Sequence, residues 1–515
     1  MPKRLVAVDI ETYDPNLKDK GDGSCRGDGK ILVAGTFDGE LAKAYIPGTS
    51  EWAEFAHMME DDNVDKVLHN GTYDLAWLVC NQGITPRGYL HDTMTRMVYI
   101  DEYADLDLDS CCKAFRLQGK NKSETIEHWM EQNAEKINMA LDIMGVPHKK
   151  GDSVWAHADV LWEGFKEYRE QVIKYNLQDC RATWHLYQAQ EPRMQEVMDP
   201  YMVDVKLTPF IIQMKKTGVL IDRNKLATLT KMVEDDYNKV ASKLETMYGV
   251  TPEMIASGDK LGKRLNVMGI HSPLKTSTGK ESWNKAARAR IDHPVMPLIE
   301  EFKNYEAILH KYLHGDMVNS ILPDGRIHCT FTPNKREEGG TVTGRFSCSH
   351  PNLQQIPKRD KPYGTSYGKP MRALFVPEAG CMMSAMDYSQ IEYLLLAHYA
   401  VGRQAEWFRA QANAGVDFHT VAMQVTGIPT RAVVKTFNYG VIYGMGAGTA
   451  LRNNYALFEK LAAEKGEDVK TFTQETYDGY HARLPVIRDT MGYVQDIARY
   501  QGYVRTIAGR SEERR

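Results

Sequence analysis

The spacing of hydrophobic residues predicts strands and short helices near the amino terminus and longer helices further along. In Leu5–Glu11 the aliphatic side chains share one face of a predicted strand, so Asp9 and Glu11 project from the other face. Val67–Asp74 predicts a second strand and a turn, with Asp74 at the start of a helix over 75–80. Carboxylates therefore lie on strand–helix elements.

The polar segment from Lys120 to about Phe165 shows patches of helical pattern. Tyr175 and Asp179, four apart, share one face of a predicted helix. Proline and charge around Glu191–Pro200 suggest a boundary. Long helical patterns then occupy Leu207–Lys216 and Arg223–Tyr248.

An apolar run near residue 385 has the pattern of a buried strand. It extends from Cys381 to Met386, ends at Asp387 and leads into a helical pattern over Tyr393–Tyr399. An acidic residue at such a junction is either a helix N-cap or a carboxylate presented at the mouth of a cleft.

Composition narrows the class of protein. The 515 residues leave room for roughly three domains, and 43% hydrophobic with 26% charged residues is typical of globular proteins. A net charge of −4 does not indicate nucleic acid, but a carboxylate-rich site and a basic groove would cancel in the sum. The eight cysteines show no C-x-x-C pair, so we expect reduced, buried thiols. The charge at Lys3 and Arg4 comes too early for a signal peptide, so we expect none, and no apolar run approaches the length of a membrane span.

The amino-terminal carboxylates suit metal-dependent phosphodiester chemistry. Asp9 and Glu11 alone could form an exposed strand face, but side by side in a buried setting they require a cation. Oxygen ligands of this kind bind paired Mg²⁺ or Mn²⁺. One ion would activate the attacking water, the other would stabilise the leaving oxygen, and the hydroxyl of Tyr175 would orient the water.

Three motifs carry a family resemblance. Asp9-x-Glu11, Asn70-x3-Asp74 and Tyr175-x3-Asp179 resemble, in order and spacing, those of the DnaQ-like proofreading 3′–5′ exonucleases. The resemblance implies a mixed α/β sheet of the RNase H-like type with two metal ions, held by Asp9, Glu11, Asp74 and Asp179. Gly21–Gly29 lacks a phosphate-loop pattern and is expected to be a flexible connection.

The middle of the chain contains a basic segment. Residues 257–293 hold eight Lys or Arg against three Asp or Glu. Such a segment is either a solvated surface or one that tracks phosphates, and the second interpretation gains weight beside a nuclease. The lysines we expect to contact DNA are Lys260, Lys263 and Lys275.

A second stripe of side chains runs along the predicted helix after Thr430. Arg431, Lys435, Tyr439 and Tyr443 recur every four residues and share one face. Two cations followed by two aromatic rings suit a ligand with a triphosphate tail and a flat base. An ordinary amphipathic helix would repeat Leu or Ile instead.

This stripe is similar to the fingers helix of the family A DNA polymerases, Arg-x3-Lys-x3-aromatic-Gly-x2-Tyr-Gly. Thr341–Ser347 with Pro351–Pro357 is similar to another of the family's signatures, and Gly218–Asp222 more loosely to its thumb. The resemblance implies that Arg345 and Gln354 contact the primer–template minor groove, where the acceptor pattern is shared among base pairs.

The same resemblance implies roles around the nucleotide. It makes Arg431, Lys435 and His419 phosphate contacts, stacks Tyr439 on the sugar and base, and puts Tyr443 at the templating position. Asp387 would hold both metal ions with the help of the Tyr388 carbonyl, and Glu392 would close the sugar pocket. Tyr439, where many members have phenylalanine, would weaken discrimination against dideoxynucleotides.

The expected architecture is an α/β RNase H-like exonuclease domain followed by a mainly α, α+β right-hand polymerase. The exonuclease would occupy 1–190, the thumb 191–330, an incomplete palm 331–400 and the fingers 401–515. The family's second catalytic aspartate, in a His-Asp-Glu turn, has no counterpart in the sequence. Two-metal nucleotidyl transfer needs carboxylates from two strands.

Three interpretations follow from that gap. The first, which we favour, is the amino-terminal part of a split, phage-type replicase completed by a separately encoded carboxy-terminal chain. The second is a free-standing exonuclease whose polymerase portion only binds DNA. The third is a decayed product. Expected partners are primer–template DNA and dNTPs, with a processivity factor as a further candidate, no membrane, and a cytoplasmic location in the host cell if the chain is viral.

Overall fold

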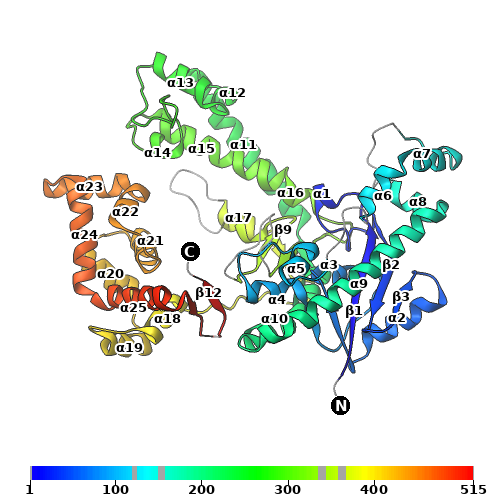
Figure 1. The fold of residues 1–515 in the computed structure, drawn as a ribbon. Helices are drawn as coiled ribbons and strands as arrows, with labels where there is room; N and C mark the ends of the chain where they lie inside the picture. Colours follow the sequence, from blue (N-terminus) through cyan, green and yellow to red (C-terminus); the bar gives the residue numbers. More distant parts are fainter. Residues whose placement is uncertain are drawn as a thin grey trace. The chain divides into compact units, whose positions relative to one another are not determined.

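The chain forms two compact units (Figure 1). The computed structural model describes residues 3–118, 125–148, 157–333, 344–357, 367–507 and 509–513. One unit comprises residues 1–239, 301–382 and 505–511, and the other comprises 240–300, 383–504 and 512–515.

A five-stranded mixed sheet organises the amino-terminal part of the first unit. Its strand order is β3-β2-β1-β4-β5. β1 is antiparallel to β2 and parallel to β4; β2 and β3 are antiparallel, and β4 and β5 parallel. The strands are β1 Arg4–Tyr13, β2 Lys30–Phe37, β3 Ala42–Tyr45, β4 Val64–Leu68 and β5 Leu90–Asp92. The predicted strand over 5–11 and the mixed sheet are confirmed.

Helices cover both faces of this sheet (Figure 1). On one face α9 (Lys166–Met194) packs Cys180 against Ala7 and Phe37. On the other face the aliphatic side chains of β1 pack against α2, α3, the π-helical turn η1 and α10. Helices of this part are α1 Leu17–Lys20, α2 Ser50–Glu60, α3 Thr72–Ala76, η1 Trp77–Asn81, α4 Thr93–Ile100, α5 Leu108–Ala114, α6 Ile126–Gln132, α7 Ala134–Ile143, α8 Ala158–Gly164 and α10 Met198–Thr217.

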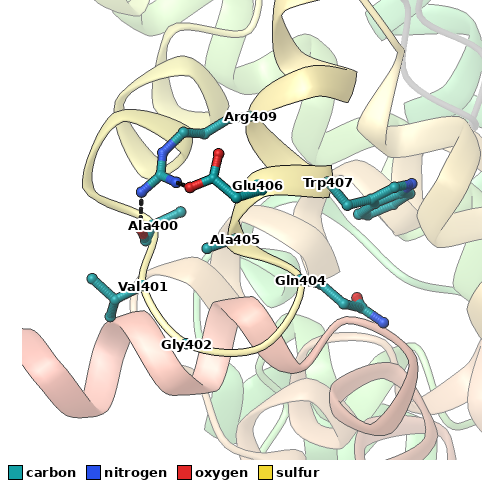
Figure 2. A pocket seen from close by; sticks show the side chains of 8 residues that line it. All are labelled: Ala400, Val401, Gly402, Gln404, Ala405, Glu406, Trp407 and Arg409. Atoms are coloured by element: carbon teal, nitrogen blue, oxygen red, sulfur yellow. Dashed lines mark hydrogen bonds and ion pairs between the residues drawn. The ribbon is translucent and has the colours of Figure 1, made fainter.

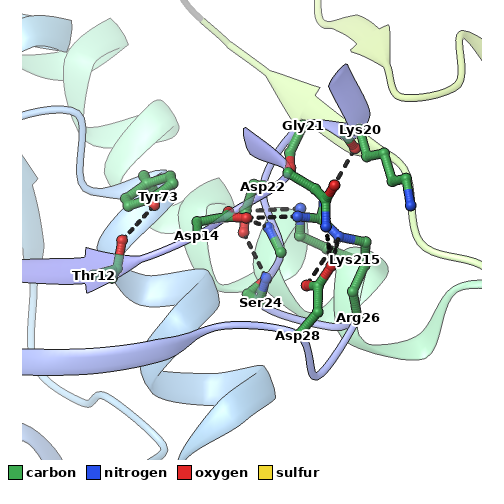
Figure 3. Close-up of polar contacts among 12 residues, drawn as sticks. Thr12, Asp14, Lys20, Gly21, Asp22, Ser24, Arg26, Asp28, Tyr73 and Lys215 are labelled. Atoms are coloured by element: carbon green, nitrogen blue, oxygen red, sulfur yellow. Dashed lines mark hydrogen bonds and ion pairs between the residues drawn. The ribbon is translucent and has the colours of Figure 1, made fainter. Parts of the chain in front are cut away.

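A polar network holds the connection between β1 and β2 (Figure 3). Arg26 donates to the Asp14 carboxylate at 2.6 Å. Lys215 of α10 lies 2.8 Å from the Asp22 carboxylate, and both side chains are more than nine-tenths buried. The prediction that Gly21–Gly29 is flexible was therefore wrong, because buried charge pairs fix this segment to the domain.

Short strands and helices complete the first unit. β6, β7 and β10 form a three-stranded sheet in the order β10-β6-β7, and β8 pairs with β9. The strands are β6 Val219–Ile221, β7 Arg326–Ile327, β8 Thr330–Thr332, β9 Ser347–Ser349 and β10 Phe375–Val376. The helices are η4 Leu309–Leu313, α16 Asp316–Asn319, η5 Leu353–Gln355 and α17 Gly368–Arg372, while α11 Arg223–Tyr248 and α15 Val295–Ile308 belong to both units.

The second unit is mainly helical around an aromatic core. Tyr393 stacks on Phe418 with ring centroids 5.1 Å apart, and Phe437 meets Tyr480 edge to face. Its helices are α12 Pro252–Ile255, α13 Gly258–Val267, α14 Lys285–Arg288, α18 Ile391–Tyr399, α19 Ala405–Asn413, α20 Phe418–Thr426, α21 Arg431–Ile442, α22 Ala447–Asn453, α23 Tyr455–Lys465, α24 Val469–Arg483 and α25 Pro485–Gln501. The strands β11 Tyr503–Arg505 and β12 Ser511–Glu513 pair with each other.

The apolar segment before Asp387 differs from its prediction. Cys381–Ser389 is exposed and forms no strand, with Met382 94% and Met386 93% accessible to solvent. An extended segment needs a neighbouring strand for its backbone hydrogen bonds, and none of the described strands pairs with it. The prediction of a buried strand over Cys381–Met386 was therefore wrong. Exposure of Cys381 likewise contradicts the expectation that all cysteines are buried.

Across the described ranges, every helix is too short or too polar to cross a lipid bilayer.

Candidate active sites

Three carboxylates predicted as metal ligands meet at the face of the sheet that α9 covers. Asp9 and Glu11 project from β1, and Asp179 projects from α9. One oxygen from each lies within 4.8 Å of the oxygens of the other two. This donor set consists of hard oxygen ligands, which fits Mg²⁺ or Mn²⁺.

Asp74, the fourth predicted ligand, supports the strand between the first two. It lies in the first turn of α3, is buried, and its Oδ1 accepts a hydrogen bond from the Ile10 backbone N–H at 3.1 Å. Burial raises the pKa of Asp74 to about 7, although the Ile10 bond acts in the opposite direction. A nearby cation would favour its ionised form at neutral pH. Asp74 is not part of the three-carboxylate group.

Two tyrosines lie next to the predicted ligand motifs in the sequence. Tyr175 is half-buried on α9 and packs against the hydrophobic cluster between α9 and β2. The hydroxyl of Tyr73, one residue before Asp74, bonds Thr12 Oγ1 at 2.7 Å. Burial raises the pKa of Tyr73, so its hydroxyl stays protonated. The water-orienting role of Tyr175 stays a prediction.

Sequence reasoning missed Asn176. This buried amide on α9 donates from Nδ2 to Asp9 Oδ2 at 2.8 Å and to the Asp9 carbonyl at 3.1 Å. The available signal was its position three residues before Asp179, which puts both side chains on one face of the helix. A polar residue on a buried face next to a ligand motif would have drawn attention to it.

In the second unit, α21 carries the cation–aromatic stripe as predicted. The helix begins at Arg431, and Gly444 adopts a left-handed conformation with φ of 83° after its end. Arg431 forms an ion pair of 2.5 Å with Asp417, and the ammonium of Lys435 lies 5.5 Å from the ring centre of Tyr439. Tyr443, at the end of the helix, is 66% exposed.

Buried polar side chains near α21 form a hydrogen-bonded network. The Nδ2 of Asn438 lies 3.3 Å from Nδ1 of His419, and the Tyr480 hydroxyl donates to Asn438 Oδ1. Burial lowers the pKa of His419, while Asp417 acts in the opposite direction. Partial burial, followed by the negative charge of Glu392, raises the pKa of Tyr439. The structure thus brings His419, Tyr439 and Glu392 into one neighbourhood.

The remaining predicted polymerase residues are placed individually. Asp387 and Tyr388 lie on the exposed segment before α18, and Tyr388 is 79% accessible. Within the described part of the chain, the exonuclease cluster is the one group of three potential metal ligands. Of the signature around Arg345, residues 341–343 lie outside the described residues.

The predicted DNA contacts are exposed. Gln354 donates from Nε2 to the Phe346 carbonyl at 3.0 Å, in the same unit as Arg345. Lys260 and Lys263 lie on α13, and Lys275 lies in the loop that follows, all in the second unit.

A shallow pocket of about 410 Å³ lies in the second unit away from these residues (Figure 2). It is formed by the turn from Ala400 to Gln404 and the start of α19, with Trp407 along its wall. Arg409 crosses it to pair with Glu406 and the Ala400 carbonyl. No predicted site residue lines it.

Comparison with known proteins agrees with this geometry. The model of DNA polymerase family A matches residues 223–514, and that of the 3′-5′ exonuclease matches residues 3–195. The chain therefore belongs to DNA polymerase family A and carries a 3′–5′ exonuclease domain.

Phage and bacterial polymerases are among its relatives. The DNA polymerase DpoZ of Acinetobacter phage SH-Ab 15497 is 25% identical, covering 88% of this chain and 74% of the relative. The DNA-directed DNA polymerase of Pseudomonas phage M6 is 26% identical, covering 98% of this chain and 80% of the relative. DNA polymerase I of Caldicellulosiruptor bescii is 32% identical over 60% of this chain, which spans only 34% of that protein.

One solved structure has a similar fold. The POL domain of Pol1 from M. smegmatis, in complex with DNA primer-template and dNTP, matches with a TM-score of 0.70 and 21% identity, over 99% of this chain and 77% of that chain. At this identity the likeness concerns the fold.

Proposed function

We propose that the amino-terminal domain is a proofreading exonuclease that removes nucleotides from DNA 3′ ends. The observation that carries this proposal is the convergence of Asp9, Glu11 and Asp179 within 4.8 Å. Two bound Mg²⁺ or Mn²⁺ ions would supply an activated water and charge stabilisation at the leaving oxygen. Asp9, Glu11 and Asp179 would hold the metal, with Asp74 as the fourth ligand, and Tyr175 would orient the attacking water.

Replacement of the two β1 carboxylates tests this proposal. Single-stranded DNA labelled at its 5′ end should shorten from the 3′ end with the wild-type chain and Mg²⁺, and stay intact with the variant Asp9→Ala/Glu11→Ala. Asp62→Ala is a matched control, since this carboxylate is 70% exposed in the same domain. Unchanged degradation by the double variant would rule out this assignment of the nuclease.

We further propose that the chain acts in template-directed DNA synthesis during replication, in the cytoplasm of a host cell. In this proposal Arg431, Lys435 and His419 bind the triphosphate, and Tyr439, Tyr443 and Glu392 form the surroundings of sugar and base. The proposal is supported by the positions of Arg431, Lys435 and Tyr439 on α21, with His419 beside them, and by membership of the family.

Completion of the polymerase site is a separate part of the proposal. Asp387 would bind two metal ions together with a second carboxylate, and we place that carboxylate on a separately encoded polymerase fragment. Support comes from Cys381–Ser389, whose apolar side chains are exposed and whose backbone pairs with no described strand. Exposed apolar surface of this kind is typical of a surface that another segment covers.

Primer extension distinguishes this proposal from a free-standing exonuclease with a DNA-binding polymerase portion. The alternative is favoured by the location of the three-ligand group, which among the described residues is in the exonuclease domain. The chain alone should fail to extend a primer, and adding the product of the downstream reading frame should start extension. Extension without a partner would contradict the split arrangement, while degradation without extension under both conditions would favour the exonuclease alone.

A further inference from the structure

The amide of Asn176 is oriented toward one carboxylate of the metal-binding cluster. Asn176 is 0% exposed, and Nδ2 donates to both Oδ2 and the backbone carbonyl of Asp9. Both atoms are acceptors, so a flipped amide would set oxygen against oxygen. The chemistry of these partners therefore defines which end of the amide faces Asp9.

The oxygen of this amide is buried in an energetically unfavourable environment. Among the described residues, Asn176 Oδ1 is buried without a hydrogen-bond partner. A buried, unpaired acceptor destabilises the fold. Gly35 on β2 leaves the space it occupies, since a Cβ there would come within 2.2 Å of Oδ1. A leucine of similar size would avoid this cost, so packing alone does not explain an amide at this position.

We propose that Asn176 is a positioning residue of the exonuclease site, which orients the Asp9 carboxylate toward Glu11 and Asp179 and thereby sets the affinity for divalent cations. The inference rests on the proposed exonuclease function. A hydrogen bond from outside the ligand set restrains a carboxylate before the metal arrives, so less orientational freedom is lost on binding.

Equilibrium binding of Mn²⁺ measures this effect without DNA or turnover. We compare wild type, Asn176→Leu and the double variant Asp9→Ala/Glu11→Ala by calorimetry and by the loss of the free-ion electron paramagnetic resonance signal. Mn²⁺ binding that the wild type shows and the double variant lacks is assigned to the exonuclease site. For that component, Asn176→Leu should bind Mn²⁺ about 10–100-fold more weakly.

Gln190→Met is a matched control on the same helix. Gln190 is also fully buried, its Nε2 donates to the Thr93 carbonyl at 2.9 Å, and its Oε1 has no partner among the described residues. It touches no carboxylate of the cluster, so its replacement should leave Mn²⁺ affinity unchanged. Asn176→Ala provides a second variant if the leucine prevents folding.

The outcomes separate the two proposals. If wild type binds Mn²⁺ at the exonuclease site and Asn176→Leu and Asn176→Ala bind it equally well, the positioning role is refuted while the exonuclease proposal stands. If wild type and the double variant bind Mn²⁺ identically, the proposed metal site itself fails. Weaker binding by Gln190→Met as well would also refute the inference, because any buried amide would then have the same effect.

Discussion

Lys215 provides a sharp test of how the segment between β1 and β2 is held. Its ammonium lies 2.8 Å from the Asp22 carboxylate (Figure 3). The same ammonium donates to Thr330 Oγ1 at 2.8 Å. Only 4% of the Lys215 side chain and 8% of the Asp22 side chain are exposed. Replacing the lysine by methionine keeps most of the side-chain volume and removes the charge.

The expected loss follows from this burial. Removing one partner of a buried ion pair leaves an uncompensated charge and costs about 3–5 kcal/mol. Lys215→Met should therefore lower the free energy of unfolding of the first unit by that amount. In the double variant Asp22→Asn/Lys215→Met neither member of this pair is charged, so about 1–3 kcal/mol of the loss should be recovered, the range found for directly interacting neighbours.

Urea unfolding of the wild type, the two single variants and the double variant gives the coupling free energy between Asp22 and Lys215. Lys216→Met is the matched control, because this neighbour on α10 is exposed and should change stability by less than about 0.5 kcal/mol. A change that small for Lys215→Met, or additive losses in the double variant, would refute the reasoning that the buried pair anchors this segment.

Three further predictions concern other parts of the chain. Burial, followed by the charge of Arg96, lowers the pKa of His91 to about 4. As the pH falls, the unfolded chain therefore protonates His91 before the folded chain does. Stability should fall as the pH drops from about 6.5 toward 4, by up to about 3 kcal/mol, and His91→Phe should flatten this part of an unfolding-versus-pH curve; an unchanged slope would contradict it. Tyr480→Phe should cost the second unit about 1–3 kcal/mol in thermal unfolding, because Asn438 Oδ1 loses its donor, and a neutral effect would argue against that bond. Salt titrations of primer–template binding should show a slope smaller by up to about 3 for the triple alanine variant, and an equal slope would argue against phosphate contacts. This variant replaces Lys260, Lys263 and Lys275.

Local spacing was enough for the elements whose partners lie nearby in sequence. The alternation in Leu5–Glu11 predicted β1, because the two faces of a strand are set by backbone geometry. The interval of four residues predicted the shared face of Arg431, Lys435 and Tyr439 on α21 for the same reason. The three exonuclease motifs named the carboxylates of the cluster.

The same reasoning was wrong where a local pattern depends on a distant neighbour. Cys381–Met386 has the composition of a buried strand, yet burial requires a paired strand, and no described strand pairs with it. Gly21–Gly29 has the composition of a flexible loop, yet buried ion pairs with residues as distant as Lys215 hold it.

The sequence by itself determined the family, the order of the domains and most candidate ligands, because these depend on motifs and on the periodicity of single elements. Tertiary structure decided that Asn176 orients Asp9, that Asp74 binds the backbone of β1 at Ile10, and that Lys215 joins Asp22 to Thr330. Each of these contacts joins residues more than 60 positions apart. Such contacts arise only when the packing of helices and sheet brings the side chains together, and no spacing within one element encodes them.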